Sequence, residues 1–245
     1  MKIICLHGGG ANSDILKTLL APVVYELAKS DKIDFVFING PLESPPAVGV
    51  AEQYDGPYYR FLNNDGPQAA QLASLARSLS KAAISPEDFS RECLARGMAI
   101  TPSSQACDFV EQQVEQHPDG PFDGVLAFSE GCSVAASLML RRAAQAKTSL
   151  FNFALFFCAI SAFHLDRPGA ILADECPDRI NVPTLHVVGA RDPALLSSMT
   201  LYNLCNQESA ALYDHGKGHT IPWGPHTEKI TSGFREVVRR AQRDL

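Results

Sequence analysis

A serine in a tight turn of small residues is the first candidate for chemistry in this sequence. Ser129 directly follows the apolar run 125–128, and a helical stretch rich in small residues begins at about residue 130. A strand–serine–helix turn needs small residues two positions before and after the serine, which Ala127 and Gly131 supply, although glycine is the usual first residue. Such a turn exposes the hydroxyl at the end of a sheet, where it can act as a nucleophile.

A histidine in a late glycine-rich loop is the candidate base. The segment 213–222 follows the last apolar run, and its glycines would let the loop approach the serine closely. His219 is the candidate general base, and His215 is the lesser candidate. These histidines are also spaced like metal ligands on a helix, but the glycines and Pro222 argue against a helix, and the glutamate of H-E-x-x-H is missing. We therefore expect no metal ion.

An aspartate after another apolar run is the candidate acid. Asp192 lies in the turn that follows the run 184–188, from which it could orient a histidine as the acid of a serine triad does. Asp166 and Asp174, which follow the preceding run, are weaker candidates. Alternatively, Asp192 only caps a helix that begins nearby.

A His-Gly-Gly-Gly loop near the start of the chain, residues 7–10, could complete an oxyanion hole. In hydrolases that carry such a serine turn, one N–H from a loop like this one and the N–H of the residue after the nucleophile bind the developing negative charge. Our candidate donors are Gly9 and Glu130, and His7 is expected to brace the loop rather than transfer protons. The loop also matches half of a dinucleotide-binding fingerprint, but Ser13 stands where its third glycine belongs. We therefore expect no cofactor.

The elements that must position these residues alternate along the chain. Nearly continuous apolar runs predict strands buried on both faces of a parallel sheet, and amphipathic patterns predict helices between them. The predicted strands are 3–6, 35–38, 125–128, 153–158, 184–188 and 210–213, and the predicted helices are about 14–29, 104–117, 130–146, 194–206 and 226–243. This alternation predicts an α/β fold with a mostly parallel six-stranded sheet and helices on both faces. The chain order of serine, aspartate and histidine is that of α/β-hydrolases.

One long segment interrupts the alternation. We expect a single domain over residues 1–245, with residues 40–103 as an insertion after the second strand. The insertion opens with proline- and glycine-rich loop sequence, reads as one or two helices after about residue 67, and has a helix start at Ser85. Insertions of this size are usually functional, so we expect a lid or pocket wall. Its aromatic residues Tyr58, Tyr59 and Phe61 would contact substrate; alternatively, the insertion is a structural elaboration.

The overall composition excludes several classes of protein. With 245 residues and 46% hydrophobic content, the chain can bury a sizeable core. A net charge of −6 argues against nucleic acid or membrane surfaces as partners. The most apolar stretch, 151–163, is too short to span a bilayer. Seven cysteines without C-x-x-C spacing are typical of reduced thiols, which predicts a cytoplasmic location.

Taken together, these motifs resemble the FSH-type serine hydrolases, a branch of the α/β-hydrolases common in fungi. The resemblance covers nearly the whole chain and rests on residues 6–10, 40–43 with 57–59, 128–131, 189–192 and 215–222. Some members of that family are esterases, and others release acyl chains from the carrier-protein thioesters of polyketide synthases. The Gly-Pro-Tyr-Tyr phrase at 56–59 and Glu130, a glutamine in many relatives, are similar to the biosynthetic-cluster members.

The resemblance implies a serine hydrolase that acts on an acyl thioester or ester. The expected partners are a small-molecule acyl substrate and an acyl-carrier domain of a polyketide synthase, with release by hydrolysis or lactone formation. The alternatives are a general short-chain carboxylesterase and a non-catalytic binding protein of the same fold. For Glu130, contact with the lid, repulsion of acidic substrates and simple exposure to solvent all stay open.

Overall fold

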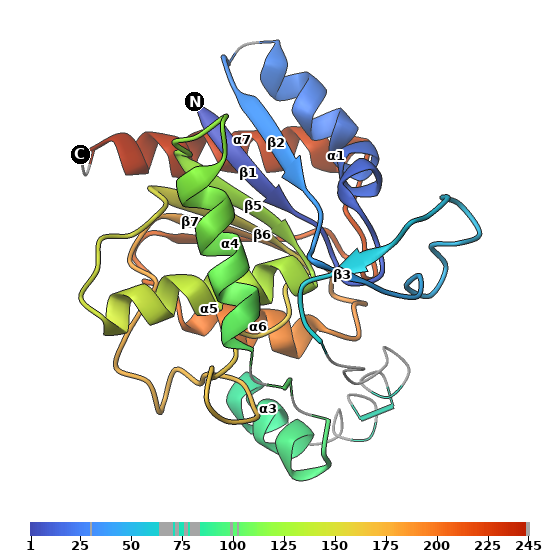
Figure 1. Ribbon diagram of the computed structural model, residues 1–245, viewed down its shortest axis with the longest axis vertical. Helices are drawn as coiled ribbons and strands as arrows, with labels where there is room; N and C mark the ends of the chain where they lie inside the picture. Colours follow the sequence, from blue (N-terminus) through green and yellow to red (C-terminus); the bar gives the residue numbers. More distant parts are fainter. Residues whose placement is uncertain are drawn as a thin grey trace.

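A six-stranded parallel sheet forms the centre of the protein in a computed structural model that describes residues 1–29, 31–63, 71, 74–75, 78, 84–98, 100–101 and 103–243 (Figure 1). The strands are β1 (Lys2–Leu6), β2 (Asp34–Ile38), β5 (Gly124–Phe128), β6 (Phe153–Phe157), β7 (Thr184–Val188) and β8 (Ala210–Asp214). Their order is β2-β1-β5-β6-β7-β8, and every neighbouring pair is parallel. The predicted strands and the predicted parallel sheet are confirmed.

The order of the strands creates a topological switch point, the place where ligands bind in open parallel sheets. From β1 the chain adds β2 on one side and β5 on the other, so the direction of winding reverses between β1 and β5. In open parallel sheets the carboxyl ends of the strands at such a switch point border the ligand site. The loop at 7–10 follows β1 and Ser129 follows β5, so both candidate motifs lie at this point.

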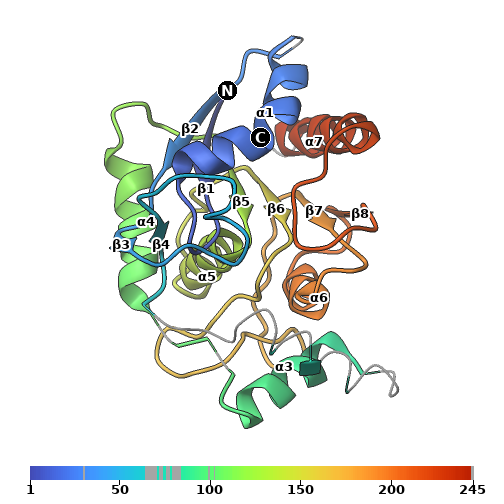
Figure 2. The same cartoon turned by 90° about the vertical axis from the view of Figure 1, so that its right-hand side faces the viewer.

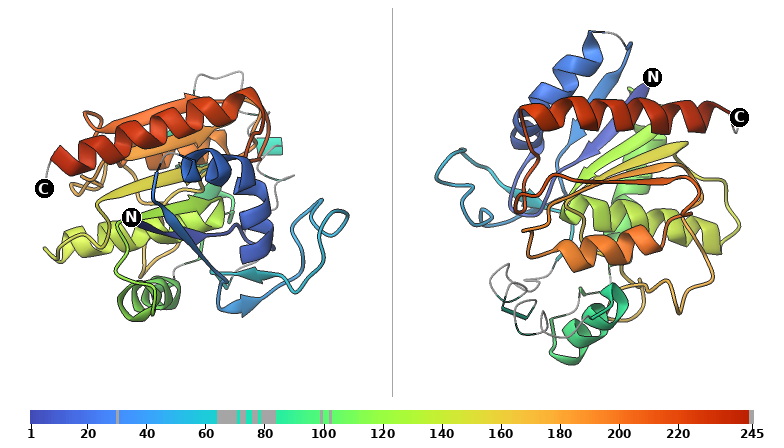
Figure 3. Two further views of the ribbon diagram at one scale, coloured as in Figure 1. Left: turned by 90° about the horizontal axis from the view of Figure 1, so that it is seen from above. Right: turned by 180° about the vertical axis from the view of Figure 1, so that it is seen from behind.

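Two hydrophobic clusters cover the two faces of the sheet. Successive side chains of a strand point to opposite faces, and accordingly Ile4 and Leu6 join one cluster while Ile3 and Cys5 join the other. Helices α4 (Ser104–Gln116), α5 (Glu130–Ala144) and α6 (Leu195–Asn203) cover the first face, and α1 (Ser13–Ala28) and α7 (Pro225–Arg243) cover the second (Figure 2). The long α7 runs across its face beside α1 (Figure 3). The predicted helices on both faces are confirmed.

The insertion at 40–103 is described in part. It contains a short antiparallel pair, β3 (Leu42–Glu43) and β4 (Tyr59–Arg60), and helix α3 (Pro86–Ala95), which begins after Ser85 as predicted. The loop between β3 and β4 projects from the body of the protein (Figure 1). Helix α3 packs on α6, where the hydroxyls of Ser90 and Thr200 are 3.1 Å apart. The helices predicted after residue 67 lie largely outside the described residues.

No helix in the described part of the chain is long and apolar enough to cross a membrane.

A buried histidine in the sheet makes the stability of this fold sensitive to acid. His186 on β7 is fully buried between Phe156 and Tyr202, and its Nδ1 has no hydrogen-bond partner among the described residues. Burial lowers the pKa of His186 to about 3. Burial likewise lowers the pKa of His7 to about 4, against a hydrogen bond to Gly8 that favours the charged form.

We expect the free energy of unfolding to fall as pH is lowered from about 6.5 towards 3. In this window the unfolded chain, with ordinary histidines, binds protons that the folded protein does not, so acid favours unfolding by about 1.4 kcal/mol per pH unit for each such histidine. His186→Phe should make the dependence shallower, whereas His117→Gln at the end of α4 should not. Urea unfolding at pH 7 and pH 4.5 measures the change in the free energy of unfolding between these two pH values. A change in His186→Phe as large as in the wild-type protein would contradict the prediction.

Candidate active site

Ser129 lies in a strained turn between β5 and α5. Its backbone has φ 53° and ψ −116°, a conformation that non-glycine residues rarely adopt and that typically marks functional sites. The turn is tight because α5 packs on the loop after β1: a Cβ on Gly131 would lie 2.6 Å from the carbonyl oxygen of Leu6. The hydroxyl of Ser129 does not cap α5, so it is free for another partner.

His219 contacts the other two residues predicted for a triad, Ser129 and Asp192. Its Nε2 is 2.9 Å from the Ser129 hydroxyl oxygen, and its Nδ1 is 2.9 Å from Oδ2 of Asp192. The loop that carries His219 lies directly on Gly189, where a Cβ would be 2.2 Å from the carbonyl oxygen of Lys217. The two loops after β7 and β8 can therefore approach closely only with glycine at this position. The side chain of His219 is one-third exposed.

Asp192 is a buried residue whose two carboxylate oxygens each have a hydrogen-bond partner. Oδ2 faces His219, and Oδ1 accepts the N–H of Ala194 at 2.8 Å. Burial alone would raise the pKa of Asp192, but the hydrogen bonds and charge of His219 and the N–H of Ala194 outweigh it and lower this pKa. Asp192 is thus ionised and does more than support the start of α6.

The lesser candidates take other positions. His215 is buried, its Nδ1 accepts the N–H of Lys217, and its Nε2 is 3.8 Å from Sγ of Cys158. Asp174 pairs with Arg91 at 2.7 Å, and Asp166 is exposed. Neither aspartate is hydrogen-bonded to His219.

Cys158 at the end of β6 is a member of the site that sequence reasoning missed. Its thiol donates to the carbonyl oxygen of Thr220 at 3.4 Å and also contacts the carboxylate of Asp192. Burial raises the pKa of Cys158 far above its ordinary value, so the sulfur stays protonated. Cys158, Asp192 and His219 form the one cluster of potential metal ligands found in the described residues. Two of these ligand atoms already bind each other, so triad hydrogen bonding accounts for the cluster.

His7 braces the loop after β1. Its Nε2 accepts the N–H of Gly40 at 2.9 Å, so the proton lies on Nδ1, which donates to the carbonyl oxygen of Gly8 at 2.7 Å. The lowered pKa keeps the ring neutral. With both nitrogens engaged and the ring fully buried, His7 has no proton to exchange with a substrate.

The two candidate oxyanion donors, Gly9 and Glu130, lie side by side. Within the described part of the chain, neither backbone N–H has a hydrogen-bond acceptor. The Glu130 carboxylate is buried, and its Oε1 accepts the N–H groups of Phe61 at 2.6 Å and Leu62 at 3.2 Å. Of the alternatives left open for Glu130, the structure shows contact with the insertion, and simple exposure to solvent does not apply.

The aromatic residues predicted to contact substrate differ in their surroundings. Tyr58 is half-buried, and its hydroxyl donates to the carbonyl oxygen of Tyr54 at 2.6 Å. Tyr59 is half-buried in β4 and pairs through its backbone with Ala11. Phe61 differs because it is 1% exposed and packs against the ring of His7, which makes it a core residue instead of an open surface.

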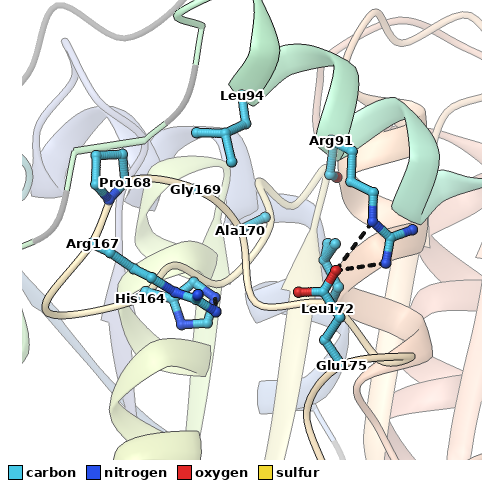
Figure 4. Close-up of a pocket in the computed structure, with 10 residues that line it drawn as sticks. Arg91, Leu94, His164, Arg167, Pro168, Gly169, Ala170, Leu172 and Glu175 are labelled. Carbon is cyan, nitrogen blue, oxygen red and sulfur yellow. Dashed lines mark hydrogen bonds and ion pairs between the residues drawn. The ribbon is translucent and has the colours of Figure 1, made fainter.

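A small cavity of about 130 Å³ lies away from these residues, between α3 and the loop after β6 (Figure 4). Arg91 and Leu94 line it from the helix, and His164 and Arg167 line it from the loop. Arg91 is bound to Glu175 there at 2.7 Å. Neither the serine nor its two partners line this cavity, so it is separate from the candidate active site.

The fold and the site define an enzyme of the serine hydrolase class with the α/β-hydrolase fold. The family model described as "Serine hydrolase (FSH1)" matches residues 1–229, and the chain belongs to this family.

Named relatives agree with this class. Esterase FUS5 of Gibberella moniliformis is 32% identical over 246 residues, which cover 99% of this chain and 89% of the relative. Esterase FPY3 of Fusarium mangiferae is 29% identical, with 98% of each chain covered. Among solved structures, esterase PE8 matches with a TM-score of 0.55 at 17% identity, covering 96% of this chain and 92% of that one. Acyl-protein thioesterase 2 of Zea mays matches with a TM-score of 0.51 at 13% identity, covering 97% and 94%. At these identities the two structures show the fold alone.

Proposed function

We propose that this protein releases polyketide or fatty-acyl chains from a carrier-protein thioester, with Ser129 as nucleophile, His219 as general base and Asp192 as the orienting acid. The observation that carries the proposal is the hydrogen-bonded series from Ser129 through His219 to Asp192, with 2.9 Å at each step. This is the arrangement that activates a serine for acyl transfer.

The reaction would proceed in two acyl transfers. His219 takes the proton of Ser129 as its oxygen attacks the acyl carbonyl carbon, and the N–H groups of Gly9 and Glu130 stabilise the resulting oxyanion. The carbon–sulfur or carbon–oxygen bond to the leaving group then breaks, and His219 gives its proton to that group. In the second transfer, His219 takes a proton from water as the water oxygen attacks the acyl carbon, the bond from that carbon to the Ser129 oxygen breaks, and His219 returns the proton to Ser129, which yields a free acid. If a hydroxyl of the acyl chain attacks instead, the product is a lactone.

The insertion after β2 is the proposed place of contact with a bulky acyl chain. We propose that residues 40–103 form a lid or pocket wall within a single domain, with Tyr58 and Tyr59 as the candidate substrate contacts. Tyr59 lies directly beside the candidate oxyanion loop, since its carbonyl oxygen accepts the N–H of Gly10 at 2.9 Å. Phe61 is not among the proposed contacts because it is buried in the core.

We expect acyl thioesters of increasing chain length to acylate Ser129 faster than matched oxygen esters. Intact-protein mass after mixing detects the acyl-enzyme, and the ratio of kcat/KM for each thioester–ester pair gives the preference. An acyl-carrier domain loaded with the same chain tests the partner directly. Faster turnover of short oxygen esters, with no thioester preference, would favour a general carboxylesterase; the relatives FUS5 and FPY3 are named esterases.

A further inference from the structure

The side chain of Glu130 is a buried carboxylate that the reaction above does not use. It sits at the first residue of α5, next to the nucleophile, with its Oε1 bound by the N–H groups of Phe61 and Leu62. Burying a carboxylate costs much free energy unless hydrogen bonds and opposite charge compensate. Here two backbone N–H groups and the charge of Arg60 offset part of that cost, and the N-terminal end of a helix favours negative charge. Burial still outweighs these hydrogen bonds and the charge of Arg60, and it raises the pKa of Glu130.

The carboxylate also touches the neighbouring oxyanion donor. A Cβ placed on Gly9 would lie 2.6 Å from Oε2 of Glu130, so the backbone of Gly9 rests against this side chain. One oxygen of Glu130 thus holds the segment after β4, and the other supports the loop after β1. The backbone N–H of the same residue is the second candidate donor.

Other bonds tie the same two segments together. The N–H of Gly10 donates to Tyr59 at 2.9 Å, and the N–H of Ala47 donates to the carbonyl oxygen of Gly10 at 2.9 Å. Gly10 has a φ of 70°, and a Cβ there would lie 2.3 Å from the backbone nitrogen of Ala47. The insertion is therefore fastened to the loop after β1 from one side by backbone bonds, and Glu130 fastens it to α5 from the other.

We propose that Glu130 is a positioning residue whose carboxylate, bound to the N–H groups of Phe61 and Leu62 and packed against Gly9, fixes the two N–H groups of the oxyanion hole relative to Ser129. The proposal rests on the proposed acyl-transfer function. The carboxylate of Glu130 is turned to the insertion backbone, where two N–H groups bind its Oε1. That arrangement argues against a role in repelling acidic substrates.

The experiment compares three substitutions of Glu130. Glu130→Ala removes the carboxylate, and we expect kcat to fall about 10- to 100-fold with KM changed far less, a loss below the roughly 10²- to 10³-fold cost of deleting a whole oxyanion donor. Glu130→Gln keeps an oxygen that can accept the same N–H groups, so it should retain most of kcat. Glu130→Asp keeps the charge but withdraws it by one methylene, so it should lose kcat selectively, as the alanine variant does.

A matched control separates positioning from general loss of stability. Glu111→Ala removes a partly buried carboxylate on α4 that pairs with Arg141 and Arg142. It should lower the melting temperature without changing kcat. Gly9→Ala offers a second check, because the φ of Gly9 suits alanine and the new methyl group collides mainly with Glu130. Its loss in kcat should not add to that of Glu130→Ala.

Three results would overturn the proposal: a kcat near wild type in Glu130→Ala, a loss in Glu130→Gln as large as in Glu130→Ala, or a rise in KM that accounts for the whole defect. If Glu130→Ala does not fold, Glu130→Asp carries the test, and a wild-type kcat in it overturns the proposal. Labelling by a fluorophosphonate probe separates the two hypotheses. A wild-type protein that does not label at Ser129 contradicts the proposed function, whereas equal labelling rates in wild type and Glu130→Ala contradict only the positioning role.

Discussion

Ser129→Ala is expected to lower kcat for ester substrates by roughly 10⁶-fold while leaving the protein folded. The serine oxygen is the atom that contacts Nε2 of His219, at 2.9 Å, so the substitution removes the proposed nucleophile. Because the hydroxyl does not cap α5, its loss leaves no helix N–H without a partner. Alanine meets the same backbone strain as serine at φ 53°, so the melting temperature should change little.

The assay for Ser129→Ala is turnover of an activated ester together with fluorophosphonate labelling. Ser133→Ala is the matched control, since Ser133 lies one turn further along α5 and its hydroxyl binds the carbonyl oxygen of Ser161 instead of His219. That control should cost about 1 kcal/mol of stability and little activity. Full activity in Ser129→Ala would mean that another residue is the nucleophile, and equal labelling in both variants would lead to the same conclusion.

The positions of the candidate catalytic residues could be predicted because each follows a strand that its own sequence specifies. A continuous apolar run such as 125–128 has few alternatives to a buried strand, and the carboxyl ends of parallel strands lie along one edge of the sheet. Three residues at three such ends therefore lie along the same edge of the sheet, whichever helices connect the strands. The small residues around Ser129 added a second, local constraint, because the turn admits no larger side chain at Gly131.

Contacts that depend on the insertion could not be predicted in this way. The segment around Tyr58 has no periodic pattern, so nothing local indicates that Phe61 turns into the core while Tyr59 pairs with Ala11. The partners of Glu130 lie 68 and 69 positions away along the chain, beyond the reach of any local motif. Cys158 is a different case, because it directly follows β6 and its place at this edge of the sheet could be predicted. Its contact with Asp192 depends in addition on the pairing of β6 with β7.

Asp192→Asn is expected to lower kcat by about 10⁴-fold, the effect of the equivalent change in serine protease triads. The N–H of Ala194 binds Oδ1 of Asp192 and will hold the amide oxygen of asparagine in the same place, which turns the amide NH₂ towards His219. An NH₂ group can only donate to Nδ1 at the 2.9 Å contact, so the ring proton must move to Nε2. Nε2 then cannot accept the proton of Ser129.

The control for this change is Asp214→Asn, at the last residue of β8, directly before the loop that carries the histidine. Asp214 Oδ1 accepts the N–H groups of Ala190 at 2.9 Å and Gly216 at 2.7 Å, and an amide oxygen can accept both equally well. Asp214→Asn should therefore keep kcat close to wild type, although it removes the same charge from the same region. Measuring kcat for both variants distinguishes a tautomer effect from a change in local charge. Equal losses in the two variants would show that the negative charge near the loop, and not the proton position on His219, determines the rate.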